Sequence, residues 1–103
     1  MKEGRTFMGE LKSILDEFIR NTVEKLVDTP SDIEAQITIS TKAVIIQIKV
    51  SKPDCGKIIG KKGRTIDALK ILCAAIKNTN FPNDTRRIII EVLEEEESDF
   101  LFK

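Results

Sequence analysis

The most informative stretch of the sequence lies just past the middle of the chain and reads Ile58-Ile59-Gly60-Lys61-Lys62-Gly63-Arg64-Thr65-Ile66. Its two glycines allow the backbone to turn tightly and to approach a ligand without interference from a Cβ atom. Lys61 and Lys62 fall between them, so we expect both charges at the exposed tip of the turn. The amides after Gly63 would begin a helix, and the N-terminus of a helix favours an anion. The stretch therefore predicts a turn between two helices that offers backbone donors and cations to a phosphate chain.

Basic residues gather around this turn on a chain that carries no net charge. The whole sequence has 17 basic and 17 acidic residues, which cancel. The segment 49–64 nevertheless contains a single acid, Asp54, among these cations: Lys49, Lys52, Lys57, Lys61, Lys62 and Arg64. Such a confined cluster predicts a local site for a polyanion rather than a generally adhesive surface.

The residues before the turn predict one helix and two strands. Residues 7–27 have the spacing of an amphipathic helix with one buried stripe. The stripe would comprise Phe7, Met8, Leu11, Ile14, Leu15, Phe18, Ile19, Thr22 and Leu26. Apolar and polar residues then alternate over 33–39 and 44–50, which predicts two half-buried strands close enough in sequence to form a hairpin.

The residues around and after the turn predict two helices and a third strand. A short helix would cover 55–59, and a longer one about 64–77 with its apolar side at Ile66, Leu69, Leu72, Cys73 and Ile76. A loop over 78–84 leads to a strand at 86–93, joined to the second strand by a helical crossover that permits parallel pairing. The sequence thus predicts an α+β domain: a three-stranded sheet with helices on one face. Ile45 and Ile89 would fall on the other face, where they would favour dimerisation through the sheet.

The composition excludes several classes of chemistry. The chain has no His, which removes Ser-His-Asp and Cys-His nucleophiles, a His general base and His-ligated zinc. Cys55 and Cys73 lack CxxC spacing and are predicted to be packing residues, so neither a metal nor another cofactor is expected. Phe is the only aromatic type, at five copies, which argues against a sheet that stacks RNA bases on aromatic rings. We therefore expect a binding domain and not an enzyme.

Other phosphate-handling motifs fit the turn poorly. A Walker A loop needs four residues between its glycines and a hydroxyl residue after its lysine, and the spacing from Gly56 to Gly60 is wrong. A dinucleotide-binding fingerprint begins with a G-x-G pair, which this stretch does not contain. A two-metal nuclease would have only Asp54 and Asp67 beside the turn, and two separated acids suit such a site poorly. A G-x-x-G alone is usually an ordinary turn, but two basic tip residues between two helices make the pattern far more specific.

With its flanks, the stretch resembles the signature of KH domains, in which a GxxG loop clamps the nucleic-acid backbone. The resemblance covers about 10–93, and it is carried by Pro53-Asp54-Cys55-Gly56-Lys57-Ile58-Ile59-Gly60-Lys61-Lys62-Gly63-Arg64-Thr65-Ile66-Asp67-Ala68-Leu69. The element order, α-β-β-α-α-β, is similar to the type II arrangement, as in small bacterial single-KH proteins of the KhpA type. Cys55 and the acidic end of the chain depart from the pattern without touching the loop.

The resemblance implies a domain that binds single-stranded RNA without catalysis. The RNA-binding residues it implies are Gly60, Lys61, Lys62, Gly63, Lys57, Arg64 and Ile59. Apolar groups of the second strand or the long helix would line a groove for the bases. It also implies an RNA chaperone in post-transcriptional regulation, paired with a second KH-containing protein of the KhpB (Jag) type or with its own copy. The alternative is a protein-interaction module with weak or no RNA binding.

The two ends of the chain carry further expectations. The N-terminal residues contain no apolar signal segment, no apolar run suits a membrane helix, and no disulfide framework is present, so we expect a cytoplasmic protein. The KH domain would span 1–93, followed by an acidic tail at 94–103. That tail is either a solubilising end or a mimic of RNA phosphate that competes for the basic loop.

Overall fold

The sheet forms where apolar and polar side chains alternate. The computed structural model describes residues 7–94, in which β1 (Glu34–Ile39), β2 (Ala43–Val50) and β3 (Arg87–Glu94) form one sheet in that order. β1 pairs antiparallel with β2, and β2 pairs parallel with β3. The predicted hairpin and the predicted parallel third strand are therefore both confirmed.

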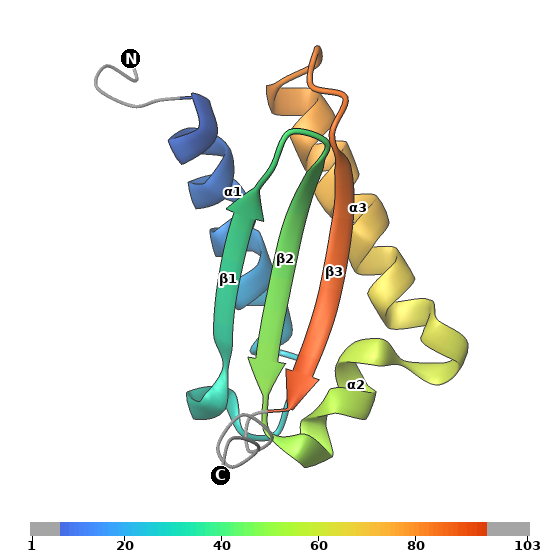
Figure 1. The fold of residues 1–103 in the computed structure, drawn as a ribbon. Helices are drawn as coiled ribbons and strands as arrows, with labels where there is room; N and C mark the ends of the chain where they lie inside the picture. Colours follow the sequence, from blue (N-terminus) through green and yellow to red (C-terminus); the bar gives the residue numbers. More distant parts are fainter. Residues whose placement is uncertain (1–6, 95–103) are drawn as a thin grey trace, which may run out of the picture.

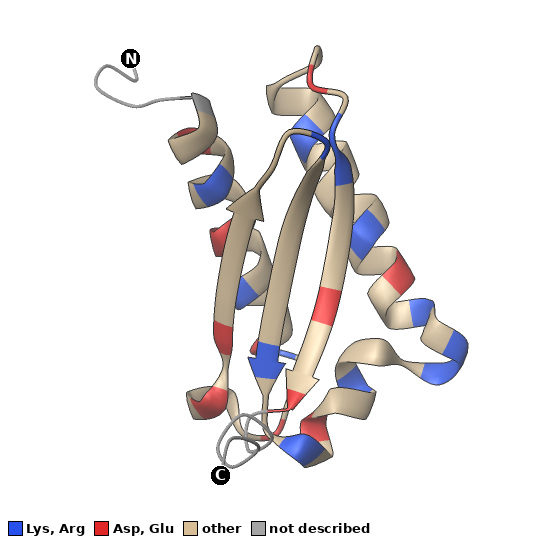
Figure 2. Cartoon of the chain, in the orientation of Figure 1, with Lys and Arg blue, Asp and Glu red and all other residues tan. Residues whose placement is uncertain are grey.

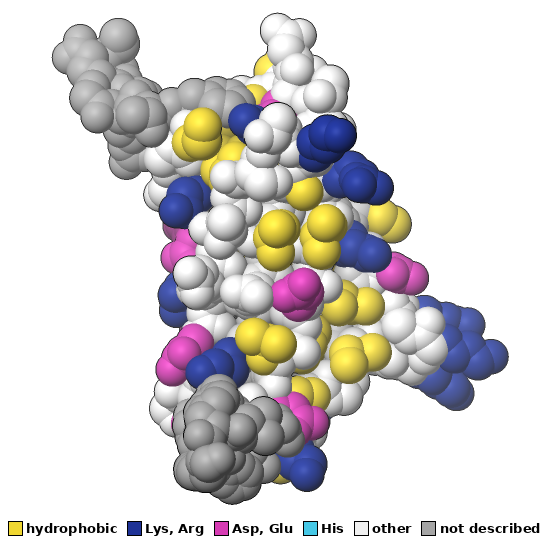
Figure 3. Space-filling model, in the orientation of Figure 1, with side chains coloured by type: hydrophobic (Ala, Val, Ile, Leu, Met, Phe, Trp, Pro, Cys, Tyr) yellow, Lys and Arg dark blue, Asp and Glu magenta, His cyan; other side chains and the backbone are white. Residues whose placement is uncertain are grey.

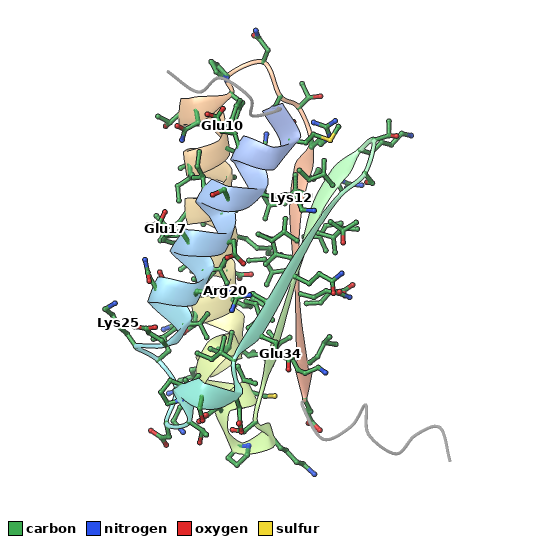
Figure 4. All side chains as sticks on the ribbon, turned by 90° about the vertical axis from the view of Figure 1, so that its left-hand side faces the viewer. Glu10, Lys12, Glu17, Arg20, Lys25 and Glu34 are labelled. Atoms are coloured by element: carbon green, nitrogen blue, oxygen red, sulfur yellow. The ribbon has the colours of Figure 1, made fainter. Side chains whose placement is uncertain are left out.

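The helices form a second layer (Figure 1). α1 (Phe7–Val23) precedes the hairpin, while α2 (Cys55–Ile59) and α3 (Arg64–Asn80) make the crossover from β2 to β3. α1 and α3 lie behind the sheet, and α2 lies beside the end of β3. Seen edge on, Arg20 of α1 points toward β1 (Figure 4), where its guanidinium donates to the carbonyl oxygen of Ala35 at 3.1 Å. This arrangement confirms the predicted α-β-β-α-α-β order and α+β class.

The core fills the space between these layers. The sheet contributes the inward side of β2, which is fully buried at Val44, Ile46, Ile48 and Val50. α1 contributes Leu11, Leu15, Ile19 and Val23, and the crossover contributes Ile58, Leu69 and Cys73. Burial raises the pKa of the Cys73 thiol to about 12, so this cysteine packs as an unreactive apolar group, as predicted.

The buried stripe of α1 differs from the prediction at both ends. The helix ends at Val23 rather than at residue 27, and a hydrogen-bonded turn follows it. Val23 is fully buried where the prediction placed Thr22, because steps of four from Leu11 lead to Val23. Met8 is 46% exposed and does not belong to the core.

The inward side of α3 also differs from the prediction. Leu69, Cys73 and Lys77, spaced by four, are its buried residues, whereas Leu72 is 48% exposed. The placement of Leu72 in the core was therefore wrong. The helix also continues three residues past the predicted end, to Asn80, whose side-chain amide donates to the carbonyl of Ile76 at 2.8 Å.

A buried charge cluster explains the lysine on the inward side of α3. The Lys77 ammonium donates to the carbonyl oxygen of Asp84 at 2.7 Å and lies 3.6 Å from its carboxylate. The same carboxylate accepts from the Arg86 amide at 2.8 Å and from its guanidinium at 2.9 Å. Burial alone would raise the pKa of Asp84, but these hydrogen bonds and both cations bring it below the usual value. The cluster fixes the α3–β3 connection.

The predicted acidic tail lies outside the described residues except for Glu94, as does the N-terminal segment 1–6. Among the described helices, none has the length and apolar character that a bilayer crossing requires.

Candidate nucleic-acid interface

The predicted turn lies between α2 and α3 and has a left-handed backbone. A short 3-10 turn, η3 (Lys61–Gly63), links the two helices. Gly60, Lys62 and Gly63 have φ values of +80°, +56° and +74°. The Gly60 amide donates to the Gly56 carbonyl at 2.8 Å, and the Gly63 amide donates to the Gly60 carbonyl at 3.1 Å. These bonds close the turn, so its tip is held away from both helices.

The two glycines are required for different reasons. A Cβ atom at Gly60 would lie 2.2 Å from Thr65 Oγ1 and 2.8 Å from the Thr65 amide nitrogen. Gly60 also has ψ 170°, which with its positive φ is a region that essentially only glycine occupies. A Cβ at Gly63 would meet nothing within 4 Å, so only its left-handed φ calls for glycine. Space for a ligand is therefore open at the Gly63 side of the turn.

The cations at the tip are exposed and lie together. Lys61, Lys62 and Arg64 are all exposed. Basic residues gather where the turn between α2 and α3 projects from the molecule (Figures 2 and 3). Within residues 7–94, none of the three forms a salt bridge. Arg64 stands at the first position of the 17-residue helix α3.

Lys57 is near the turn but is already paired. Its ammonium lies 3.2 Å from the Asp28 carboxylate and 3.6 Å from that of Asp54. The hydrogen bond and charge of Asp28, together with Asp54, raise the pKa of Lys57. The structure thus places Lys57 on α2 with partners of its own, unlike Lys61 and Lys62.

Asp54 is a structural link that the sequence did not reveal. Its side chain is 1% exposed and accepts from the amides of Asp28 at 3.1 Å and Thr29 at 3.0 Å, and from the Ser51 hydroxyl at 3.1 Å. Burial alone would raise the pKa of Asp54, but these donors and Lys57 bring it below the usual value. An Asp before a helix usually suggests an N-cap, whereas this carboxylate ties the α1–β1 connection to the start of α2.

These contacts also bear on the nuclease alternative. Asp54 is occupied by structural donors, and Asp67 on α3 is exposed and lies 4.0 Å from Lys70. No group of three potential metal ligands occurs in the described part of the chain. Of the two acids beside the turn, Asp54 is therefore buried among structural donors and Asp67 lies at the surface.

Apolar groups accompany the loop. Ile59, the last residue of α2, is 40% exposed next to Gly60, while Ile58 is fully buried and Ile66 packs against the core. β3, at the edge of the sheet, contacts both α2 and α3.

Comparison with known proteins finds matches to a single family profile and to several proteins that share one name. The sequence profile described as the KhpA/KhpB KH domain matches residues 16–92. A Chlamydia pneumoniae protein named RNA-binding protein KhpA is 36% identical over 81 residues, covering 79% of this chain and 99% of that protein. Proteins of the same name from Clostridium perfringens (30% identical; 77% of this chain, 100% of that protein) and Borreliella burgdorferi (35%; 76% and 90%) are also similar.

Proposed function

The chain belongs to the KhpA/KhpB family of KH domains, and from that premise we propose that it binds single-stranded RNA through the turn at residues 60–63. One observation carries the proposal. Lys61 and Lys62 are exposed on a left-handed turn at the start of a long helix, and neither forms a salt bridge with another residue of 7–94. Relatives of this family are named RNA-binding proteins, which supports RNA as the ligand.

Each residue of the proposed site has a chemical role. Lys61, Lys62 and Arg64 attract phosphates, and the open space at Gly63 lets the sugar-phosphate backbone approach the amides at the start of α3. The exposed Ile59 supplies an apolar surface for a base. Lys57 contributes less than the tip residues, because its charge is balanced by Asp28 and Asp54.

The proposal includes the setting in which the protein acts. The KH domain would occupy 1–93 and act without catalysis as an RNA chaperone in post-transcriptional regulation in the bacterial cytoplasm. RNA held only through its backbone and a few unstacked bases can be exchanged or re-paired, which suits that role.

Charge reversal at the loop tip tests RNA binding. Lys61→Asp with Lys62→Asp should abolish binding to a short single-stranded RNA and leave the melting temperature nearly unchanged, because exposed substitutions usually cost less than about 0.5 kcal/mol. Lys12→Asp with Lys25→Asp is the matched control, since both lysines are exposed at or beyond α1 and the charge change is equal. Equal loss in both double variants would show that net charge matters and that the loop is not the site.

A second candidate function, a protein-interaction module, is favoured by the outer side of α3. Ile71 is 68% exposed and Leu72 is 48% exposed, and both lie between the exposed Ala68 and Ala75. The spacing 68, 71, 72, 75 places these residues on one face of the helix, as in helices that pack against another element. The alanines at both ends of this stripe would allow a partner to approach the helix closely. We propose that this stripe receives a protein partner, either a KhpB (Jag)-type protein or a second copy.

The two candidate functions have separate tests. Ile71→Asp with Leu72→Asp should abolish association, measured by sedimentation equilibrium alone and by titration with a KhpB-type protein. The affinity of one loop for a short RNA should persist in that variant. Unchanged association would remove the stripe from consideration, and loss of RNA binding by the monomer would mean that α3 was disturbed as a whole.

A further inference from the structure

β1 forms one edge of the sheet, and its hydrogen-bonding groups face two ways. The hairpin closes with the Ser40 amide donating to the Ala43 carbonyl at 2.8 Å, so the main-chain groups of Ser40 point toward β2. Such groups point to alternate sides along a strand. Those of Ala35, Ile37 and Ile39 therefore point away from β2, to the outside of the sheet. An edge of this kind presents the donors and acceptors that a further strand would use.

Only one end of this edge is closed by the chain itself. The Arg20 guanidinium donates to the outward carbonyl of Ala35 at 3.1 Å, and it is held by a 3.0 Å salt bridge to Asp16. Among the hydrogen bonds within residues 7–94, none uses the outward amide or carbonyl of Ile37 or Ile39. The opposite edge of the sheet differs, because β3 contacts α2 and α3.

A groove of about 470 Å³ lies between the open part of this edge and α1. Its α1 side consists of Met8 and Lys12, and its β1 side consists of residues 35–39. Met8, Lys12, Asp16 and Arg20 are spaced by four, so they form one row along α1. Figure 4 shows Lys12 and Arg20 on the side of α1 that faces β1. This row closes the edge at Arg20 and leaves it open at Met8 and Lys12.

The lining of the groove determines what it can hold. Met8 is 46% exposed and offers a flexible apolar surface that adapts to different side chains. Lys12 is exposed, and no other residue that lines the groove is charged. An extended peptide would pair with the outward groups of Ile37 and Ile39, as in other complexes formed by strand addition. Its side chains toward α1 would be apolar against Met8 and acidic beside Lys12.

We propose that β1 receives an extended acidic peptide of a partner protein, which adds a fourth strand to the sheet. Side chains alternate along a strand, so every second residue of the peptide faces α1 and the others face solvent, as Gln36 and Thr38 do. The bond of Arg20 to Ala35 sets one end of the site. β1 and the turn between α2 and α3 lie at opposite edges of the molecule (Figure 1), so the peptide leaves the basic loop free for RNA.

Amide hydrogen exchange in the full-length chain tests this proposal. In the protein alone, the amides of Ile37 and Ile39 should exchange at least about tenfold faster than those of Gln36 and Thr38, which point toward β2. The probe is the acetylated and amidated peptide Thr-Val-Thr-Glu-Thr-Val-Thr, in which valine and glutamate share one side. At millimolar concentration it should slow exchange at Ile37 and Ile39 and shift their amide resonances, without shifting those of residues 61–64. The same peptide with both valines replaced by proline should have no effect, because proline has no amide hydrogen.

Substitution of the groove lysine tests the chemistry of the peptide. Lys12→Glu should weaken binding of the probe about three- to tenfold, because an exposed ion pair is replaced by a repulsion. Lys25→Glu is the matched control, since Lys25 is exposed and lies beyond the end of α1, outside the groove. Neither variant should change the affinity for RNA, which separates this site from the basic loop.

Three results would overturn the proposal. Slow exchange at Ile37 and Ile39 in the protein alone would mean that the edge is already paired, by this chain or by a second copy. Shifts that are missing, or that are equal with the proline peptide, would mean that no strand is added at β1. Equal weakening by Lys12→Glu and Lys25→Glu would mean that the groove does not select for an acidic peptide.

Discussion

Lys62 is the only residue other than glycine with a positive φ in the described part of the chain. A left-handed conformation costs an L-residue roughly 1–2 kcal/mol, and such strain is concentrated at binding sites. The cost is offset here by the bonds that close the turn on either side. This conformation holds an exposed lysine between Gly60 and Gly63, where the proposed site would receive a phosphate.

Alanine substitutions at the two glycines should differ in their cost. Gly63→Ala should lower stability by about 1–2 kcal/mol, because only its left-handed φ is unfavourable. Gly60→Ala should cost more, since its Cβ would also lie 2.8 Å from a backbone nitrogen of Thr65. Chemical denaturation of both variants measures this difference. Equal losses would mean that the backbone at Gly60 relaxes freely and that the steric argument fails.

The sequence revealed the loop but not this division of roles. The two glycines and the tip lysines could be predicted because turn chemistry is local in sequence. The conflict at Gly60 comes from Thr65, the second residue of α3, which the geometry of the turn brings close to Gly60. Similarly, Lys57 looked equivalent to Lys61 until the structure brought Asp28, far away in sequence, to its ammonium. Contacts of that range leave no pattern in neighbouring residues.

At the scale of elements, Asp54 joins the end of α1 to the helix that carries the loop. It accepts from two backbone amides of the α1–β1 connection while sitting at the start of α2. Buried charged acceptors with several donors are costly to alter, because each donor loses its partner. The position of the loop relative to α1 thus depends on this carboxylate.

Asp54→Asn should destabilise the protein in a manner that depends on pH. The folded state lowers the pKa of Asp54 below its ordinary value of 3.8, so the ionised carboxylate stabilises the fold at neutral pH. This contribution is fully present above the ordinary value and is lost as pH falls through the lower, folded pKa. The difference in melting temperature between parent and variant should therefore be constant from pH 7 to about 5 and shrink below about pH 4.

Asp67→Asn serves as the control for this measurement, since that carboxylate is exposed and its distance to Lys70 is 4.0 Å. It should change the melting temperature little at any pH, because exposed ion pairs contribute about 0–1 kcal/mol. A pH-independent loss in the Asp54 variant would contradict the role given to its charge.

The elements themselves were predictable to different degrees. β1 followed from strict alternation, which fixes the inward side of a strand. β2 and β3 alternate less strictly, because they contain the apolar runs 44–46 and 88–90. The orientation of α3 was harder, because Ile71, Leu72 and Cys73 are consecutive apolar residues and periodicity alone cannot choose among them. The buried residues of α3 are Cys73 and the residues four before and four after it, Leu69 and Lys77. Lys77 is held in this buried position by its bond to Asp84. Sequence periodicity assigns a lysine to the solvent side of a helix because it is charged, so the burial of Lys77 could not be predicted from it.

Across the whole molecule, three surfaces are separate from one another. The basic loop projects beside α2 and α3 (Figure 2), the outer side of α3 exposes Ile71 and Leu72, and the open face of the sheet carries Ile45 beside Ile89. Because the net charge is zero, long-range attraction of RNA rests on the local cluster rather than on the protein as a whole. RNA binding should accordingly respond to salt through a few cations only.

The salt dependence of RNA affinity tests whether the cations of the loop hold the RNA. Log affinity for single strands falls with log salt by about 0.7 for each neutralised phosphate, so Lys61, Lys62 and Arg64 predict a slope of about −2. In Lys61→Gln with Lys62→Gln, the slope on the same oligonucleotide should shrink to about −0.7, because one of the three cations remains. Parallel lines for the parent and the double variant would contradict the account, since RNA would then be held by cations elsewhere on the protein.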